Sequence, residues 1–379
     1  MIVLDRDPAN PLLKPNLEHD WESYATFNGC ILKDQNTYHL LYRAMGKEQD
    51  YQAERLHLSV IGHAVSTDGK IFTDNHPLIV PEESWELYGC EDPRVVKIDG
   101  TYIILYTALS EFPPTPNGIK VAVALSDDLK TIKERHLVTP FNAKAMTFFP
   151  QKINGKYVAF LTAHTDLPPS KIAIAEFESL EEMWSPKYWR EWYLSLDTHV
   201  LPLQRMNSDQ LEVGAPPVAT EYGWLFVYAN IRHYYTPGFR DFTIEAVLLD
   251  RQNPMKVIGR IRESLLRPEV NYEHDGIVPQ VVFPSGAIID DDTFYLYYGA
   301  ADTTCCRASY PYKQLLQRIQ TSDALPPKLE KFKENPILAA KPEHEWESQA
   351  VFNPAAFYDG TNINILYRAF SHDNTSTIG

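Results

Sequence analysis

Short runs of aromatic and β-branched residues recur along the chain, and each is entered through Gly, Asn or Asp. The runs are NTYHLLYRA (36–44), GTYIILYTA (100–108), GKYVAFLTA (155–163), YGWLFVYAN (222–230) and DTFYLYYGA (292–300). This composition behind a turn residue predicts a β-strand. A sixth run, TNINILYRA, begins at Thr361.

Two further elements accompany each run. A strand of small and apolar residues follows it and ends in an acidic turn, as in VAVALSDD (121–128). A short segment, in most cases with Pro or Gly near its start, precedes it: FNGCIL (27–32), EDPRVV (91–96), FFPQKI (148–153), GAPPVA (214–219) and FPSGAI (283–288). Five such units of roughly 65 residues predict an all-β fold, a five-bladed β-propeller. Helices are expected only at 179–193 and 312–320.

A longer repeat overlies this one. EHDWESYATFN (18–28) returns as EHEWESQAVFN (343–353), and the match runs without a gap from residues 10–44 to residues 335–369. We therefore expect residues 1–332 to form the propeller. Residues 333–379 are then the start of a second, truncated copy of the same domain, a first-blade repeat. The alternative is an extra blade that packs against the rim.

Composition narrows the function classes. The net charge of −15 argues against a nucleic-acid partner, which needs a basic surface. It suits a neutral ligand, or an anion held by a few local cations. No apolar run reaches the ~20 residues of a membrane span. Four cysteines, two of them adjacent at 305 and 306, form neither a disulfide framework nor a zinc-type spacing, so we expect buried thiols and a cytoplasmic protein.

The innermost strand of each blade lines the central funnel of a propeller, and its polar residues converge there. The candidates on the expected inner strands or near them are Asn28, Glu91, Asp92, Arg94, Lys152, Glu212 and Ser285, and those at strand ends are Arg43, His164, Asp166 and Asp302. Carboxylates and cations at one funnel mouth, among many aromatic residues, indicate a site for a hydroxylated substrate. The alternatives are a structural Asp–Arg pair in GCEDPR (89–94), a solvated Lys152 and a packed His164. No metal-ligand cluster, phosphate loop or nucleophile elbow is present.

The motifs GCEDPR (89–94), FFPQKINGKY (148–157), GAPPVATEYGWLFVY (214–228) and YLYYGAADT (295–303) resemble glycoside hydrolase family 130. The resemblance covers about residues 8–332 in order. It implies a five-bladed propeller that cleaves β-mannosides with inversion, either with water or with phosphate. By the same resemblance Asp92 is the general acid, delivering its proton through the mannose 3-hydroxyl. Asn28, Arg43, Arg94, Lys152 and Asp302 then match sugar-contacting positions.

The chain also departs from the phosphorylases of that family. A His-Arg pair is expected after GKY and a histidine after the GWL strand, but the chain reads AFLTAHTD and VYANIRHY there. Because those basic groups hold phosphate, their absence favours an inverting β-mannosidase in which Asp166, Glu212 or Glu273 acts as the base. Lys120, Lys144, His164 or Arg232 could instead replace them.

Three other interpretations stay open. The first alternative is a β-mannoside phosphorylase that releases mannose 1-phosphate, with inorganic phosphate as co-substrate; otherwise no cofactor is expected. The second is a catalytically inactive propeller that only binds glycans, against which the presence of both Asp92 and Arg94 argues. The third is an arabinan- or fructan-active propeller. The expected partner is a small oligosaccharide, and the sequence does not indicate an oligomeric state.

Overall fold

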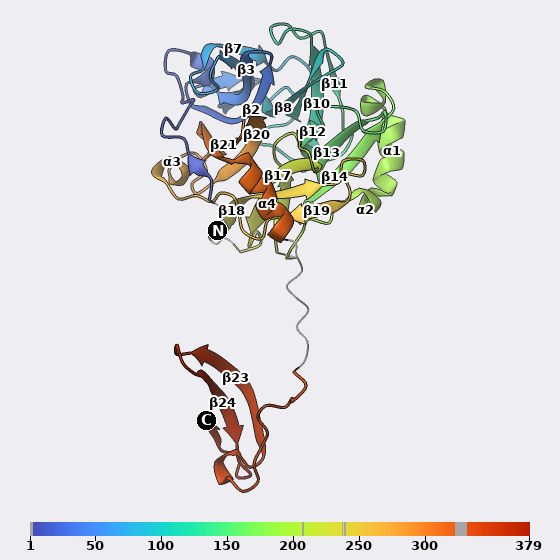
Figure 1. Ribbon diagram of the computed structural model, residues 1–379. Coiled ribbons are helices and arrows are strands. Elements are labelled where there is room, and N and C mark those ends of the chain that lie inside the picture. The colour runs from blue at the N-terminus through green and yellow to red at the C-terminus, as the bar shows by residue number, and fades with distance from the viewer. Residues whose placement is uncertain (1–2, 207, 237, 239, 323–331) are drawn as a thin grey trace. The chain divides into compact units, whose positions relative to one another are not determined.

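The computed structural model describes residues 3–206, 208–236, 238, 240–322 and 332–379. It divides into two compact units, Met1–Ala324 and Leu325–Gly379. Figure 1 shows the five sheets of the first unit arranged in a ring in chain order, as a five-bladed β-propeller.

Each blade is an antiparallel sheet built outward from its inner strand. The first holds β2 (Ala25–Asp34), β3 (Thr37–Met45), β6 (Ser59–Ser66) and β7 (Thr73–Ile79), with a hairpin of β4 (Gln49–Tyr51) and β5 (Glu54–Leu56) inserted. The second holds β8 (Gly89–Ile98), β9 (Thr101–Leu109), β10 (Ile119–Ser126) and β11 (Glu134–Leu137). The third holds β12 (Ala143–Phe148), β13 (Tyr157–Ala163) and β14 (Lys171–Phe177).

The fourth and fifth blades complete the ring. The fourth holds β15 (Gln210–Val213), β16 (Val218–Ala219), β17 (Trp224–Arg232), β18 (Asp241–Leu249) and β19 (Val257–Arg260). The fifth holds β20 (Val282–Asp290), β21 (Thr293–Ala300), β22 (Thr304–Pro311) and, as its outer strand, the N-terminal β1 (Asp5–Arg6). The helices are α1 (Pro186–Leu194), α2 (Leu196–His199), α3 (Asn271–His274) and α4 (Tyr312–Ser322). The aromatic runs that the sequence singled out are the middle strands β3, β9, β13, β17 and β21.

Every blade contacts the next, and the fifth contacts the first. Ion pairs join the first blade to the second, Lys97–Asp34 (2.7 Å), and to the fifth, Lys33–Asp290 (2.6 Å). Hydrogen bonds join the third blade to the second, from Tyr157 to Asp99 (3.4 Å), and to the fourth, from the Val213 backbone amide to the Thr162 hydroxyl (2.8 Å). Val227 of the fourth blade and Val282 of the fifth belong to one apolar cluster. The buried core therefore lies between blades, where sheets pack face to face.

The expected inner strand of the third blade is displaced. Residues 148–153 were expected to form it, but β12 ends at Phe148 and Lys152 lies in the turn beyond. β12 carries a β-bulge between Lys144 and Thr147, as β8 does between Glu91 and Arg94. Lys144 is thus the third-blade residue that corresponds to Glu91.

A buried glutamate anchors the entry loop of three blades and of the repeat. Each follows an aromatic residue and accepts a hydrogen bond from a middle-strand tyrosine: Glu22 from Tyr42, Glu86 from Tyr106, Glu273 from Tyr298 and Glu347 from Tyr367. All four glutamates are at most 2% exposed. The recurring WES and WEL tripeptides are therefore structural.

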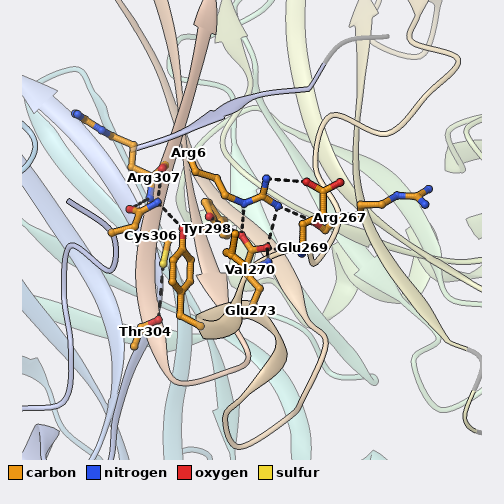
Figure 2. A network of polar contacts seen from close by, with 11 residues as sticks. Arg6, Arg267, Glu269, Val270, Glu273, Tyr298, Thr304, Cys306 and Arg307 are labelled. Carbon is orange, nitrogen blue, oxygen red and sulfur yellow. Dashed lines mark hydrogen bonds and ion pairs between the residues drawn. The ribbon is translucent and has the colours of Figure 1, made fainter. Parts of the chain in front are cut away.

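In the fifth blade this glutamate also holds the N-terminal strand (Figure 2). Arg6 on β1 donates from Nε and Nη2 to Glu273 (2.8 and 2.9 Å) and from Nη1 to the half-exposed Glu269 (3.0 Å). The Tyr298 hydroxyl donates to Glu273 Oε1 (2.8 Å), the oxygen that also accepts from Arg6 Nε. Because Glu273 is fully buried, its charge is compensated mainly by Arg6.

The second unit repeats the first blade in detail. It holds β23 (Ala350–Tyr358), β24 (Ile363–Phe370) and β25 (Ser376–Ile378). The Arg368 guanidinium lies 4.9 Å from the Phe352 ring, as Arg43 does from Phe27. Leu366, however, is 51% exposed, whereas its counterpart Leu41 is buried. We propose on these contacts that residues 333–379 are the first-blade repeat of a second copy, with apolar faces made for neighbouring blades.

Replacing Arg6 by Met should destabilise the propeller by about 3–5 kcal/mol, because it leaves Glu273 buried without its cation. Urea denaturation followed by tryptophan fluorescence measures this change. The matched control is Glu269→Gln, which removes the exposed half of the same network and should cost under about 1 kcal/mol. Equal effects of the two substitutions would contradict the role given to the buried pair.

Candidate active site

A pocket of about 530 Å³ opens among the inner strands and receives side chains from all five blades. Its charged and polar lining residues are Asn28, Arg43, Glu91, Asp92, Thr107, Lys144, Thr165, Gln210, Glu212, Tyr234, Arg240 and Asp302. Its apolar lining includes Phe242 and Phe283. Charged groups beside apolar surface fit a sugar, which has polar edges and a hydrophobic face.

β-Bulges aim the inner-strand side chains into this pocket. Asn28 and Asp92 sit at corresponding bulges in β2 and β8 and adopt positive φ angles of 51° and 49°. Ala145 takes the same conformation (48°) in β12. Such angles are unfavourable for residues other than glycine and concentrate at functional sites. A regular strand would alternate these side chains between the two sheet faces instead.

Asp92 lies in a dense polar cluster. Its Oδ1 accepts a hydrogen bond from the Asn28 amide (2.8 Å) and lies 3.9 Å from Arg43 Nη1. Arg43 also forms an ion pair with Glu91 and donates to the Ser59 hydroxyl (3.0 Å). This geometry holds the Asp92 carboxyl in one orientation at the pocket wall.

Burial, together with repulsion between the carboxyl groups, makes two carboxyls of this cluster keep a proton to a higher pH than usual. Burial raises the pKa of Asp302 to about 6; repulsion from Asp92 adds to this effect and Arg43 opposes it. Burial also raises the pKa of Glu91. The positive charge of Arg43 opposes this rise, and repulsion from Asp92 adds to it. A retained proton is what general acid catalysis requires.

A second ion pair lies across the pocket. Lys144 Nζ is 2.9 Å from Glu212 Oε2, and Glu212 is 5% exposed. Burial alone lowers the pKa of Lys144, but the Glu212 carboxylate outweighs burial and the net pKa is raised. Lys144 therefore keeps its positive charge at neutral pH.

Three buried polar atoms at the pocket have no hydrogen-bond partner among the described residues. They are Asn28 Oδ1, Thr107 Oγ1 and Gln210 Oε1. Buried polar groups are nearly always paired in folded proteins. All three residues contribute to the pocket lining.

Arg94 lies beneath the pocket and does not line it. The side chain is 1% exposed and donates to the carbonyls of Asp92, Pro93, Gly214 and Pro284. These carbonyls belong to the second, fourth and fifth blades. Arg94 therefore fixes three inner-strand segments relative to one another, which makes it a positioning residue.

Three other expected residues lie away from the pocket lining. Lys152 forms an ion pair with Asp99 (2.8 Å), His164 contacts the Tyr193 hydroxyl (2.7 Å), and Asp166 is exposed. Ser285 is buried and donates to the Phe283 carbonyl. The base candidate Glu273 forms an ion pair with Arg6, as described above.

The structure adds residues that sequence reasoning missed. Gln210 precedes the expected inner strand, Thr107 lies within a middle strand, and Tyr234 and Arg240 lie in the β17–β18 loop. Of these residues, only Thr107 could have been predicted from the sequence, because it lies near the end of a strand that leads to the funnel. Among the described residues there is no cluster of three or more His, Cys, Asp or Glu suited to a metal ion.

The fold and pocket agree with the relationships of the chain. A family model described as beta-1,4-mannooligosaccharide phosphorylase matches residues 4–321, and the chain belongs to this family, glycoside hydrolase family 130. A 1,2-beta-oligomannan phosphorylase and a beta-1,2-mannobiose phosphorylase of Thermoanaerobacter sp. (strain X514) are each 35% identical over 309 residues, covering 80% of this chain and 95% of each relative. The protein is thus an enzyme of this family.

Solved structures show the same fold. A beta-1,2-mannobiose phosphorylase from Listeria innocua, in complex with beta-1,2-mannobiose, superposes with a TM-score of 0.66 at 24% identity over 84% of this chain and 99% of that one. A structure reported for family 130 glycoside hydrolases that target beta-1,2-mannosidic linkages in Candida mannan has a TM-score of 0.65 at 25% identity over 82% and 94%. Among the described residues, no helix is long and apolar enough to span a membrane.

Replacing Asp302 by Asn should make stability less dependent on pH. The carboxyl has a pKa of about 6 in the folded protein, above its ordinary value of 3.8, so the folded state favours the neutral form. The stability that this preference contributes is present below pH 3.8 and is lost as the pH rises through about 6.

The variant minus parent difference in free energy of unfolding should therefore grow in favour of the variant from pH 4 to pH 7. Chemical denaturation at a series of pH values measures it. A difference that stays flat over this range would show that Asp302 ionises without cost.

Proposed function

We propose that the protein is a β-1,2-mannoside phosphorylase that forms mannose 1-phosphate from short β-mannosides, with Asp92 as general acid. The observation that carries this proposal is the position of Asp92, held by a bulge and by Asn28 at the wall of a pocket that is lined by residues from all five blades. The two Thermoanaerobacter relatives, named as phosphorylases of β-1,2-linked mannosides, support both the nucleophile and the linkage. The phosphorylase alternative is thus better supported than the hydrolase favoured by the sequence.

The reaction is a single displacement. A phosphate oxygen bonds to C1 of the mannose unit while the bond from C1 to the glycosidic oxygen breaks. The proton that the leaving oxygen needs comes from the Asp92 carboxyl, directly or through the sugar 3-hydroxyl. Arg43 and Asn28 hold that carboxyl in place, and burial raises the pKa values of the neighbouring carboxyls of Asp302 and Glu91.

Hydrolysis is the second candidate, and one observation favours it. Glu212 is a buried carboxylate in the pocket, ion-paired with Lys144, and lies on the fourth blade rather than beside Asp92. An inverting hydrolase needs such a carboxylate to activate water on the far face of the sugar. The solved structure reported for family 130 glycoside hydrolases, which is 25% identical to this chain, supports this candidate.

Phosphate separates the two candidates. With β-1,2-mannobiose and inorganic phosphate the enzyme should yield equal amounts of mannose and mannose 1-phosphate, with negligible turnover when phosphate is omitted. Asp92→Asn should lower kcat about 10²–10⁴-fold, the usual contribution of a general acid. Chromatography of the products measures both effects.

The control variant is Asp166→Asn, because Asp166 is an exposed aspartate outside the pocket lining and should keep parental turnover. If mannose were released at a rate independent of phosphate, and if Glu212→Gln abolished that release, the enzyme would be a hydrolase and the proposed phosphorolysis would be wrong. A loss below tenfold in Asp92→Asn would reject the acid role.

A further inference from the structure

Phosphorolysis requires the pocket to hold a phosphate dianion beside several carboxylates. This pocket contains the carboxylates Glu91, Asp92, Glu212 and Asp302. A dianion placed among them is repelled unless a cation with spare hydrogen-bond donors faces it. The cations of the pocket therefore decide where phosphate can bind.

Two of the three pocket cations are already neutralised. Arg43 is ion-paired with Glu91 and lies near Asp92, and its Nε is taken by Ser59. Lys144 is ion-paired with Glu212. Each already shares its charge with a carboxylate, so a phosphate bound there would also face that carboxylate.

Arg240 is the third. It lies on the loop between β17 and β18, with its Nε donating to the Tyr234 carbonyl (2.9 Å) and its guanidinium 4.4 Å from the centre of the Tyr234 ring. No carboxylate of the described chain lies within ion-pair distance of it, and its Nη1 and Nη2 make no hydrogen bond to a described residue. The ring fixes the plane of the guanidinium, while the two terminal nitrogens remain available.

The other basic residues that the sequence offered do not meet this need. Arg232 donates to the buried Glu245 (3.1 Å) and lines a separate cavity of about 350 Å³. His164 is bonded to Tyr193. Neither His164 nor Lys120 lines the pocket.

We propose that Arg240 binds the phosphate co-substrate through Nη1 and Nη2, as a bidentate pair, with Tyr234 holding the guanidinium flat. This inference rests on the proposed phosphorolysis. A guanidinium fork matches two phosphate oxygens, which a lysine ammonium does not. Arg240 is on the fourth blade and Asp92 on the second, so the two side chains reach the pocket from blades that are not neighbours.

Steady-state kinetics with each substrate varied in turn tests the proposal. Arg240→Gln should raise the KM for phosphate about tenfold or more and leave the KM for β-1,2-mannobiose within about twofold, since one charge-assisted bidentate pair is lost. Arg240→Lys should recover part of the loss, because it restores the charge without the fork. Arg55→Gln, which changes an exposed arginine outside the pocket, is the control and should behave as the parent.

The outcomes are distinct. A phosphate-dependent parent whose phosphate KM changes less than twofold in Arg240→Gln overturns the role of Arg240 and leaves the proposed function standing. An equal rise in both KM values also overturns it, because Arg240 would then act on the sugar site as a whole. A parent that turns over without phosphate overturns the proposed function itself. Thermal melting of each variant, expected to be unchanged at this exposed position, excludes misfolding as the cause.

Discussion

The pocket depends on one backbone constraint, the β-bulge in the inner strands. Asn28, Asp92 and Ala145 take left-handed conformations at equivalent points of three blades. Each such conformation costs about 1–3 kcal/mol and persists only where the surrounding structure enforces it. Arg94 supplies part of that enforcement, because its guanidinium ties the carbonyls at the Asp92 bulge to the inner strands of two other blades. The position of Asp92 is therefore a property of the whole ring.

Buried glutamates stabilise the same ring at the loops that enter its blades. Glu22, Glu86 and Glu273 fasten the loops that enter three blades, each through a middle-strand tyrosine. In the fifth blade Arg6 extends this device to the N-terminal strand, which completes the sheet. The repeat keeps the glutamate and tyrosine as Glu347 and Tyr367. The longest sequence match in the chain, residues 10–44 with 335–369, thus contains this structural pair as well as the pocket residues Asn28 and Arg43.

Sequence reasoning reached the blades and the pocket residue Asp92 because both leave strong local signals. Aromatic and β-branched runs mark the middle strands, and EDPR marks a turn-like break in a strand. It failed in the third blade, where FFPQKI resembles the other inner strands but lies beyond the bulge, so Lys152 was chosen in place of Lys144. It missed Tyr234 and Arg240 because a loop has no periodic pattern, and only the fold brings them to the pocket.

In the proposed reaction, a proton from Asp92 and a phosphate nucleophile act on opposite faces of one mannose unit. The anomeric configuration of the first product tests it most directly. NMR spectra recorded during the first turnovers of β-1,2-mannobiose with phosphate should show mannose 1-phosphate in the α configuration. A β-configured product would contradict the account, because it requires two displacements and a covalent intermediate on the enzyme.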